Sequence, residues 1–259
     1  MKVMDATRQN SRYGMAIDLD RCSGCGACTV ACAVENNIPP GNPRVTERTG
    51  ITWIKVQEVQ NGESFPMAKS VFIPVLCQQC EEGTPCVSVC PQNAVEVDPA
   101  TGIVGQIAER CLGCRYCMAA CPYHARYFNW WDPKWPKGME KALNPEVAPR
   151  MRGVVEKCNF CLGRLHTARQ SAAADGRRKL NKDEYVPACV DSCPAKAITF
   201  GDLADEASDV AKLANCDRAF RFLSRLGTEP KISYLSSQPW VRKLADRELA
   251  RTMKEMVHG

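Results

Sequence analysis

The chain has 259 residues, of which 45% are hydrophobic and 24% charged, and its net charge at pH 7 is +5. This composition excludes a disordered chain, the mean hydropathy of −0.30 argues against a membrane-embedded one, and the charge is too mild to demand nucleic acid as a partner. Disulfides do not explain the 17 cysteines well. A chain of this length does not need disulfide bonds for stability, and an odd number of cysteines cannot all pair within one chain. We interpret them as metal ligands.

Residues 1–14 contain no apolar stretch and no twin-arginine pair, so we expect no export signal in this segment. Folding in the reducing cytoplasm would keep the thiolates free for metal. Residues 13–18 have the pattern of a strand, and they lead into the first of four cysteine groups.

Sixteen of the cysteines fall into four groups of four, and this internal repeat organises the chain. The first and third groups share the spacing C-x2-C-x2-C-x3-C, the second has a wider middle gap, and the fourth carries a long insertion between its halves. A proline follows the last cysteine of the second, third and fourth groups. The groups are Cys22, Cys25, Cys28 and Cys32; Cys77, Cys80, Cys86 and Cys90; Cys111, Cys114, Cys117 and Cys121; and Cys158, Cys161, Cys189 and Cys193.

The spacing of the cysteines indicates which metal they bind. Three thiolates spaced two residues apart can hold one face of a cluster, and the run C-x2-C-x2-C-x3-C-P is the signature of two-cluster bacterial ferredoxins. In those ferredoxins the fourth cysteine binds the other cluster. Structural zinc prefers two separated pairs of ligands and leaves the closely spaced third cysteine without a role. We therefore predict four [4Fe–4S] clusters, with zinc sites and disulfides as weaker alternatives.

The segments between the groups predict a ferredoxin-like fold. Residues 94–97 alternate like a strand, residues 98–102 form a turn, and residues 103–107 return as a second strand. Further strands are expected at residues 71–75 and 197–200. The predicted fold class is α+β, with two nested bacterial-ferredoxin-like modules of two clusters each and a C-terminal helical extension.

Distance along the chain predicts which groups share their fourth ligands. Only the hairpin separates groups two and three, so we expect them to form one two-cluster module and groups one and four to pair across it. The expected sets are site 1, Cys22, Cys25, Cys28 and Cys193; site 2, Cys158, Cys161, Cys189 and Cys32; site 3, Cys77, Cys80, Cys86 and Cys121; and site 4, Cys111, Cys114, Cys117 and Cys90. The alternative, with group one paired to group two and group three to group four, remains open.

The C-terminal part contains the seventeenth cysteine. Cys216 lies in the periodic stretch 208–226, which predicts a helix ended by Gly227 and a small buried apolar role for the thiol. Residues 240–257 are amphipathic and mildly basic, which predicts another helix, solvated or bound to a partner. The expected domains are an outer module at 11–67 and 152–202, an inner module at 68–131, a connecting loop at 132–151 and the helical extension at 203–259.

Several motifs resemble one known family. These are C-S-G-C-G-A-C at 22–28, C-V-S-V-C-P at 86–91, C-L-G-C-R-Y-C-M-A-A-C-P at 111–122, G-V-V-E-K-C at 153–158 and L-G-T-E-P at 226–230. They are similar to the four-cluster electron-transfer (beta) subunits of the complex iron–sulfur molybdoenzyme family. Within it, the chain is most similar to the iron–sulfur subunits of menaquinone reductase complexes of sulfate reducers. Some relatives lack one cysteine of the third group, but Cys114 is present here, so four [4Fe–4S] clusters are expected.

The resemblance implies a function in anaerobic respiration. Such a subunit relays electrons between a large molybdopterin-enzyme-like catalytic subunit, or a multihaem cytochrome c, and a polytopic quinone-binding membrane subunit. It implies that site 4 faces the membrane partner and that sites 1 and 2 face the catalytic partner. It also implies a peripheral protein attached to the membrane through its partners, with the periplasmic face favoured over the cytoplasmic one.

No catalytic motif accompanies the cysteines. The chain has no phosphate loop, no dinucleotide fingerprint after a strand, no nucleophile elbow and no H-E-x-x-H. We therefore expect a subunit of an oxidoreductase complex with no substrate site of its own. A soluble polyferredoxin serving a hydrogenase or formate dehydrogenase is one alternative, and a non-redox zinc scaffold is another. Aromatic residues gather at 116–135, where they either pack over a cluster or form a docking surface for a partner.

Overall fold

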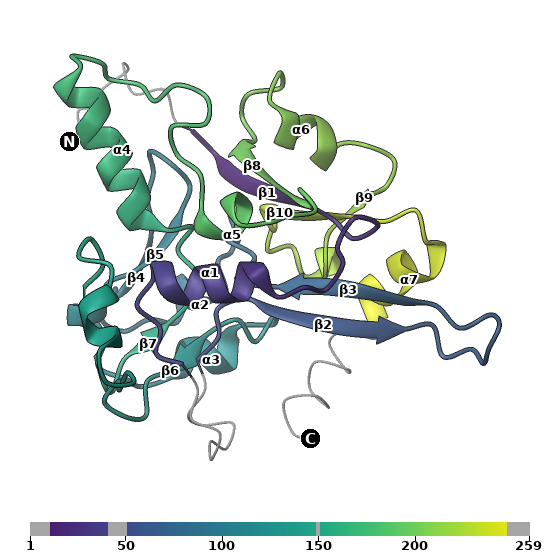
Figure 1. The fold of residues 1–259 in the computed structure, drawn as a ribbon, viewed down its shortest axis with the longest axis horizontal. Helices are drawn as coiled ribbons and strands as arrows, with labels where there is room; N and C mark the ends of the chain where they lie inside the picture. The colour runs from purple at the N-terminus through teal and green to yellow at the C-terminus, as the bar shows by residue number, and fades with distance from the viewer. Residues whose placement is uncertain (1–10, 41–50, 149–150, 248–259) are drawn as a thin grey trace.

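A mixed four-stranded sheet joins the two ends of the chain in the computed structural model, which describes residues 11–40, 51–148 and 151–247 (Figure 1). Its order is β8–β1–β10–β9, formed by β1 (Tyr13–Asp18), β8 (Ile198–Asp202), β9 (Ala219–Phe220) and β10 (Ile232–Leu235). β1 runs antiparallel to β8 and parallel to β10. Both faces of β1 are buried, which explains its nearly continuous apolar sequence.

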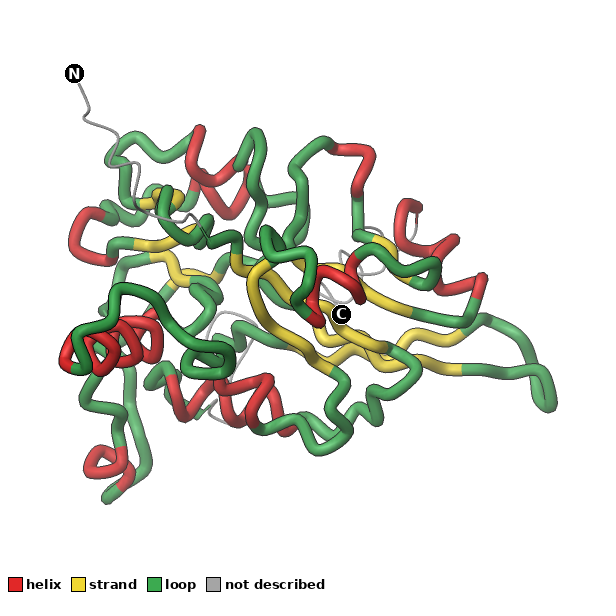
Figure 2. The backbone as a smooth tube through the Cα atoms, turned by 90° about the horizontal axis from the view of Figure 1, so that it is seen from above, coloured by secondary structure: helices red, strands yellow, loops and turns green. Residues whose placement is uncertain are grey.

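The other described strands form three two-stranded antiparallel sheets. They are β2 (Lys55–Gln60) with β3 (Ser70–Val75), β4 (Val95–Val97) with β5 (Val104–Gln106), and β6 (Tyr127–Phe128) with β7 (Val155–Glu156). The β2–β3 hairpin extends well beyond the rest of the molecule in both ribbon and tube views (Figures 1 and 2).

The helices are short, and four of them each carry the third cysteine of one group. These four are α1 (Ala27–Glu35), α2 (Pro85–Ser88), α3 (Tyr116–Ala120) and α5 (Ala188–Asp191). α1 packs against α5, and α2 packs against α3. The remaining helices are α4 (Leu162–Ala174), α6 (Asp209–Ala214), α7 (Pro239–Arg247) and the 3-10 turns η1 (Ala108–Arg110), η2 (Met139–Ala142) and η3 (Ser224–Leu226).

The buried apolar residues divide into one large cluster and two small ones. The large cluster lies between the sheet and the β2–β3 hairpin and contains Ile17, Ile73 and Ile232. A small cluster under the β4–β5 hairpin contains Val95 and Val104 together with cysteines of the second and third groups. The other small cluster packs α6 against the second face of β1. The large cluster also contains Cys80, with Cys77 and Cys121 packed against it, so site 3 shares the apolar surroundings of the outer groups, while the thiols expected at site 4 lie mostly in the small cluster.

The α+β fold class is confirmed, and the strands expected at 13–18, 71–75, 94–97, 103–107 and 197–200 are found as β1, β3, β4, β5 and β8. The single helix predicted over residues 208–226 is wrong. Its N-terminus is right, because the Ser208 hydroxyl accepts from the Ala211 N–H, but the helix ends at Ala214. The turn-forming residues 215–218 then reverse the chain into β9, and Cys216 lies half-buried in that turn against the α6 cluster.

The C-terminal extension contains helices as expected, but β9 and β10 also belong to it and place two strands in the sheet of the outer module. The helix expected over 240–257 begins as α7, and residues beyond 247 lie outside the described part of the chain. Among the described helices, none is both long and apolar enough to cross a membrane. The boundaries of the outer module, inner module, connecting loop and extension stay predictions.

Candidate metal sites

Each C-x2-C loop turns in the same way. The residue immediately before the second cysteine of every group has a left-handed backbone, with φ of 72° at Gly24, 50° at Gln79, 75° at Gly113 and 56° at Phe160. Gly113 is required by space as well as by conformation, because a Cβ there would collide with the carbonyl oxygen of Gly153. This turn brings the first two thiols of a group to the same side of their loop.

The outer groups meet across most of the chain. Burial is the main cause that raises the pKa of Cys22 and of Cys28. The thiol of Cys193 raises the pKa of both further, so it lies close to both. Cys32 is surrounded instead by Cys158 and Cys161 of group four, and these thiols add to the burial that raises its pKa. The thiols expected at site 1 and at site 2 therefore lie together.

The inner groups exchange their last cysteines in the same way. Burial raises the pKa of Cys80 to about 12, and its thiol neighbours include Cys77, Cys121 and Cys86. Cys121 thus lies with group two rather than with its own group three. The thiols expected at site 3 come together in this way.

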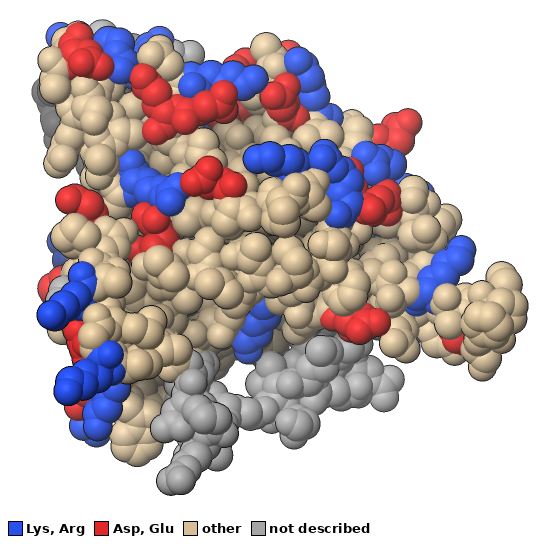
Figure 3. Space-filling view, in the orientation of Figure 1, with Lys and Arg blue, Asp and Glu red and all other residues tan. Residues whose placement is uncertain are grey.

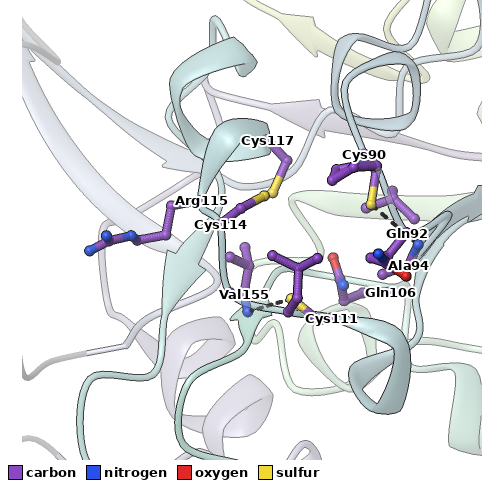
Figure 4. Close-up of a pocket in the computed structure, with 13 residues that line it drawn as sticks. Cys90, Gln92, Ala94, Gln106, Cys111, Cys114, Arg115, Cys117 and Val155 are labelled. Carbon is purple, nitrogen blue, oxygen red and sulfur yellow. Dashed lines mark hydrogen bonds between the residues drawn. The ribbon is translucent and has the colours of Figure 1, made fainter.

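The four thiols expected at site 4 line one small pocket. Cys90 lies across it from Cys111, Cys114 and Cys117, as Figure 4 shows, while the Arg115 side chain points away. The Cys111 Sγ accepts the Val155 N–H at 3.5 Å, so β7 also contributes a donor to this site.

The last cysteine of each group receives a hydrogen bond from the residue four positions later. The Ala94 N–H donates to Cys90 Sγ at 3.2 Å, and the Ala197 N–H donates to Cys193 Sγ at 3.3 Å. Burial and the Cys77 thiol raise the pKa of Cys121 to about 11, against the Ala125 N–H, which favours the thiolate. Backbone donors of this kind stabilise negative sulfur.

Left-handed residues create these three turns. Asn93, His124 and Lys196 have φ of 48°, 48° and 49°, and each directly precedes the donating alanine. The turns were not predicted, although the repeat C-P-x-x-A in groups two, three and four is a readable signal. A proline after the cysteine ends the previous hydrogen-bonding pattern and favours such a turn.

The first group lacks the proline and uses a side chain instead. α1 continues through Cys32, so no backbone N–H is free to turn back. Asn36 is 3% exposed, and its Nδ2 donates to Cys32 Sγ at 3.7 Å and to Cys161 Sγ at 3.8 Å. One buried amide therefore bridges two thiols expected at site 2.

Neighbouring sites adjoin in a row. Burial raises the pKa of Cys32 of site 2, and Cys28 of site 1 is among the thiols that raise it further. Burial, followed by Cys77 of site 3, raises the pKa of Cys158 of site 2 to about 12. Burial also raises the pKa of Cys117 of site 4, and Cys86 of site 3 raises it further. The thiol sites thus follow the order 1, 2, 3, 4 through the molecule.

Burial sets the chemistry that these thiols require. A buried thiolate is costly unless a positive group compensates it, and iron supplies that compensation when a cluster binds. Among the described residues, no three His, Cys, Asp or Glu side chains converge closely enough to hold a single metal ion.

Two of the expected ligands, Cys25 and Cys114, are exposed. Beside Cys25, the outward face of α1 presents Val30 and Val34, whose exposed fractions are 63% and 64%, over a concave surface. The middle of the face in Figure 3, over α1, carries few charged side chains. A surface of this type is typical of a protein interface.

Several aromatic and apolar side chains between residues 112 and 131 are exposed. Leu112, Tyr116 and Trp131 are more than half exposed, whereas Tyr123 is buried. The Arg115 guanidinium lies over the rings of Phe128 and Trp130, 5.2 and 4.9 Å from their centroids. The aromatic group near residues 116–135 therefore divides into a packed part and an exposed part.

Two protein-family descriptions match the chain: a 4Fe-4S binding domain at residues 13–34 and a 4Fe-4S dicluster domain at residues 68–141. The iron–sulfur cluster-binding subunit of menaquinone reductase from Nitratidesulfovibrio vulgaris is 49% identical over 92% of this chain and 94% of its own length. A putative iron–sulfur subunit of dimethyl sulfoxide reductase from Halobacterium salinarum is 37% identical over 92% of this chain and 86% of its own. The arsenate respiratory reductase iron–sulfur subunit of a Shewanella species is 34% identical over 87% and 97%.

Proposed function

Because the chain belongs to the family of iron–sulfur electron-transfer subunits of the complex iron–sulfur molybdoenzymes, we propose that it relays electrons through four [4Fe–4S] clusters. The relay joins a large catalytic or cytochrome-facing subunit to a quinone-reactive membrane subunit of a respiratory oxidoreductase complex. The likeness to a menaquinone reductase subunit supports menaquinone as the quinone.

The row of adjoining thiol sites carries this proposal. Each proposed site combines three cysteines of one group with one cysteine of another, and the thiols that raise the pKa of Cys22, Cys32, Cys158 and Cys117 support this row of adjoining sites. When bound, the clusters supply one-electron chemistry, and the protein places them and tunes their potentials by burial, charge and hydrogen bonds to sulfur. Sites 1 to 4 with the sixteen cysteines named above are the proposed ligand sets.

The exposed ends of the row are the proposed contact points for partners. Site 4, with the exposed Leu112 and Tyr116 two positions from Cys114 in the sequence, would face the membrane subunit. Site 1, with the apolar face of α1 beside Cys25, would face the catalytic or cytochrome subunit. This assignment of ends follows the family resemblance, and the exposed apolar residues support an interface at each end.

We place the complex at the periplasmic face of the membrane, with the protein held there by its partners. A twin-arginine signal encoded on a neighbouring catalytic-subunit gene would support this side, and cofractionation with cytoplasmic markers would contradict it.

Cluster content tests the proposal directly. Protein purified without oxygen should contain iron and labile sulfide in equal amounts, close to four of each per cluster for four clusters. Cys114→Ala should alter one cluster and hinder quinone-linked turnover. The matched control is Cys216→Ser, because Cys216 lies outside every site and its loss should change no cluster signal. Iron near four atoms per chain or fewer would contradict four clusters.

Copurification tests the partners. The protein solubilised from membranes in detergent should remain bound to a larger subunit and a membrane subunit. A monomeric chain with full cluster content and no membrane partner would favour the soluble polyferredoxin function instead.

A further inference from the structure

A buried arginine lies between the two inner sites. Arg126 is 3% exposed and stands between Ala125, the backbone donor at Cys121, and the first residue of β6. Its Nη1 donates to Gln106 Oε1 at 2.9 Å. Its Nε and Nη2 are buried and find no hydrogen-bond partner among the described residues, and no described carboxylate pairs with it. Burying a guanidinium in this way is costly unless negative charge faces it.

The negative charge that faces Arg126 comes from expected cluster ligands. Burial by itself lowers the pKa of Arg126, but Cys86, Cys117 and Cys77 together raise it above its ordinary value. Cys86 and Cys77 belong to site 3, and Cys117 belongs to site 4. The guanidinium keeps its charge at every physiological pH, so it is a permanent cation between two sites.

Other basic residues near the sites differ from Arg126. Lys157 is also buried, but its Nζ donates to the carbonyl oxygens of Val104 and Cys158, which solvate the ammonium group. Arg115 is close to site 4 in sequence, but it is exposed and its guanidinium lies over two aromatic rings. Of these three cations, only Arg126 has buried nitrogens without a hydrogen-bond partner among the described residues.

We propose that Arg126 is the shared counter-charge of the clusters at sites 3 and 4, and that its unpaired N–H groups donate to cluster sulfur. This inference rests on the proposed function. A cluster held by four thiolates is negatively charged, and reduction adds one more electron to it. A fixed cation in a buried site stabilises the reduced state more than the oxidised state, and so raises the reduction potential. Because Arg126 faces both sites, it raises both potentials together.

The test is a redox titration of the anaerobically purified full chain, followed by electron paramagnetic resonance. The Cys80→Ser and Cys114→Ser variants first assign the signals of sites 3 and 4. In Arg126→Gln, the equilibrium constant for reduction of each inner cluster should fall about tenfold, which is ~59 mV for a one-electron couple. The clusters at sites 1 and 2 should keep their potentials.

Two variants serve as controls. Arg126→Lys keeps the charge and should hold the inner potentials close to those of the unmodified chain. Arg115→Gln removes a solvent-screened charge near site 4 and should shift its potential far less than Arg126→Gln does. If the Arg126→Gln protein does not retain its inner clusters, the Arg126→Lys protein provides the test. Unchanged potentials of its two inner clusters support the counter-charge. A change of tenfold or more in the equilibrium constant for reduction of both inner clusters overturns it.

Unchanged inner potentials in Arg126→Gln, or an equal shift of all four clusters, would overturn the inference. The proposed function fails separately, because its failure would appear in the unmodified chain as missing clusters.

Discussion

The inner and outer sites use the same number of thiols but very different lengths of chain. The inner thiols all come from residues 77–121, and α2 packs directly against α3 within this segment. The outer thiols come from residues 22–32 and 158–193, and β1 must pair with β8 before these groups can meet. The inner sites therefore depend on local structure, and the outer sites depend on the sheet.

The two halves of a ferredoxin-like module can thus be joined either by a short segment of chain or by a long one. The inner module has the hairpin β4–β5 between its halves, whereas the outer module has the whole inner module between its halves. Contacts between residues far apart in sequence cost more loop-closure entropy, so they need more support from packing. The outer sites receive that support from the large apolar cluster around Ile17, Ile73 and Ile232.

Among the tests of this difference between inner and outer sites, Cys32→Ser has the largest expected effect. Cys32 belongs to the first sequence group but lies with Cys158 and Cys161, so Cys32→Ser should disturb the cluster at site 2 and leave site 1 intact. The spectrum of reduced protein should match that of Cys161→Ser. A spectrum that matches Cys25→Ser instead would mean that the outer groups do not exchange their last cysteines.

Shortening Ile232 is the next largest change. Ile232 is fully buried in β10 against the large apolar cluster, so Ile232→Ala should lower the free energy of unfolding by about 2–5 kcal/mol. Chemical denaturation of the cluster-loaded protein measures it, and the clusters at sites 1 to 3 should be lost at lower denaturant than the cluster at site 4, because their thiols pack in or against the large cluster. The matched variant is Val95→Ala in the small cluster under β4–β5, for which the cluster at site 4 should be lost first. The same order of loss in both variants would argue against separate support.

Asn36 permits a smaller and more specific test. The other groups use backbone donors that shortening a side chain does not remove, but Asn36→Ala removes the Nδ2 that reaches both Cys32 and Cys161. The lost hydrogen bond should destabilise the reduced cluster at site 2 by about 1 kcal/mol and move its potential to a more negative value. A redox titration measures this shift, and the control is Asn37→Ala, which removes a buried amide that bonds, among the described residues, only to the backbone of Asn144 and Val147. Equal shifts in both variants would mean that Asn36 acts only through packing.

The smallest expected effect concerns an ion pair between helices of the outer module. Arg164 of α4 contacts Glu35 of α1 at 2.9 Å and Asp191 of α5 at 3.5 Å, with a third of its side chain exposed. Arg164→Met should lower the free energy of unfolding by about 0.2–1 kcal/mol, and the difference should shrink at high salt. Thermal unfolding at low and high ionic strength checks this, and a difference that salt leaves unchanged would point to lost packing instead.

Sequence patterns predicted the parts of the fold that short-range chemistry determines. The spacing of cysteines and the Cys-Pro endings marked the loops, and alternation of apolar residues marked β4 and β5 within one residue of their bounds. The backbone donors at sulfur were not predicted, although the repeat C-P-x-x-A marks each of them, because the repeat does not by itself reveal the left-handed residue. Asn93, His124 and Lys196 share no side-chain property, and the structure shows their common left-handed φ.

Long-range packing determined what the sequence could not reveal. β10 has only four residues, Ile232–Leu235, and its partner β1 stands more than 200 positions earlier. So short a segment shows no periodicity, and its strand conformation depends on the open edge of β1. Arg126 was not predicted for a similar reason, since an arginine beside a strand usually points to water, and only the folded chain encloses it.

The central position of β1 has a consequence for biosynthesis. β1 leaves the ribosome long before its two neighbours in the sheet, β8 and β10. During that interval both hydrogen-bonding edges of an apolar strand stay without partners, which is the condition that promotes aggregation. The inner module can fold earlier, because its hairpin and helices are complete by residue 128. A chaperone that shields residues 13–18 until synthesis ends should therefore raise the yield of intact protein more than additional iron would.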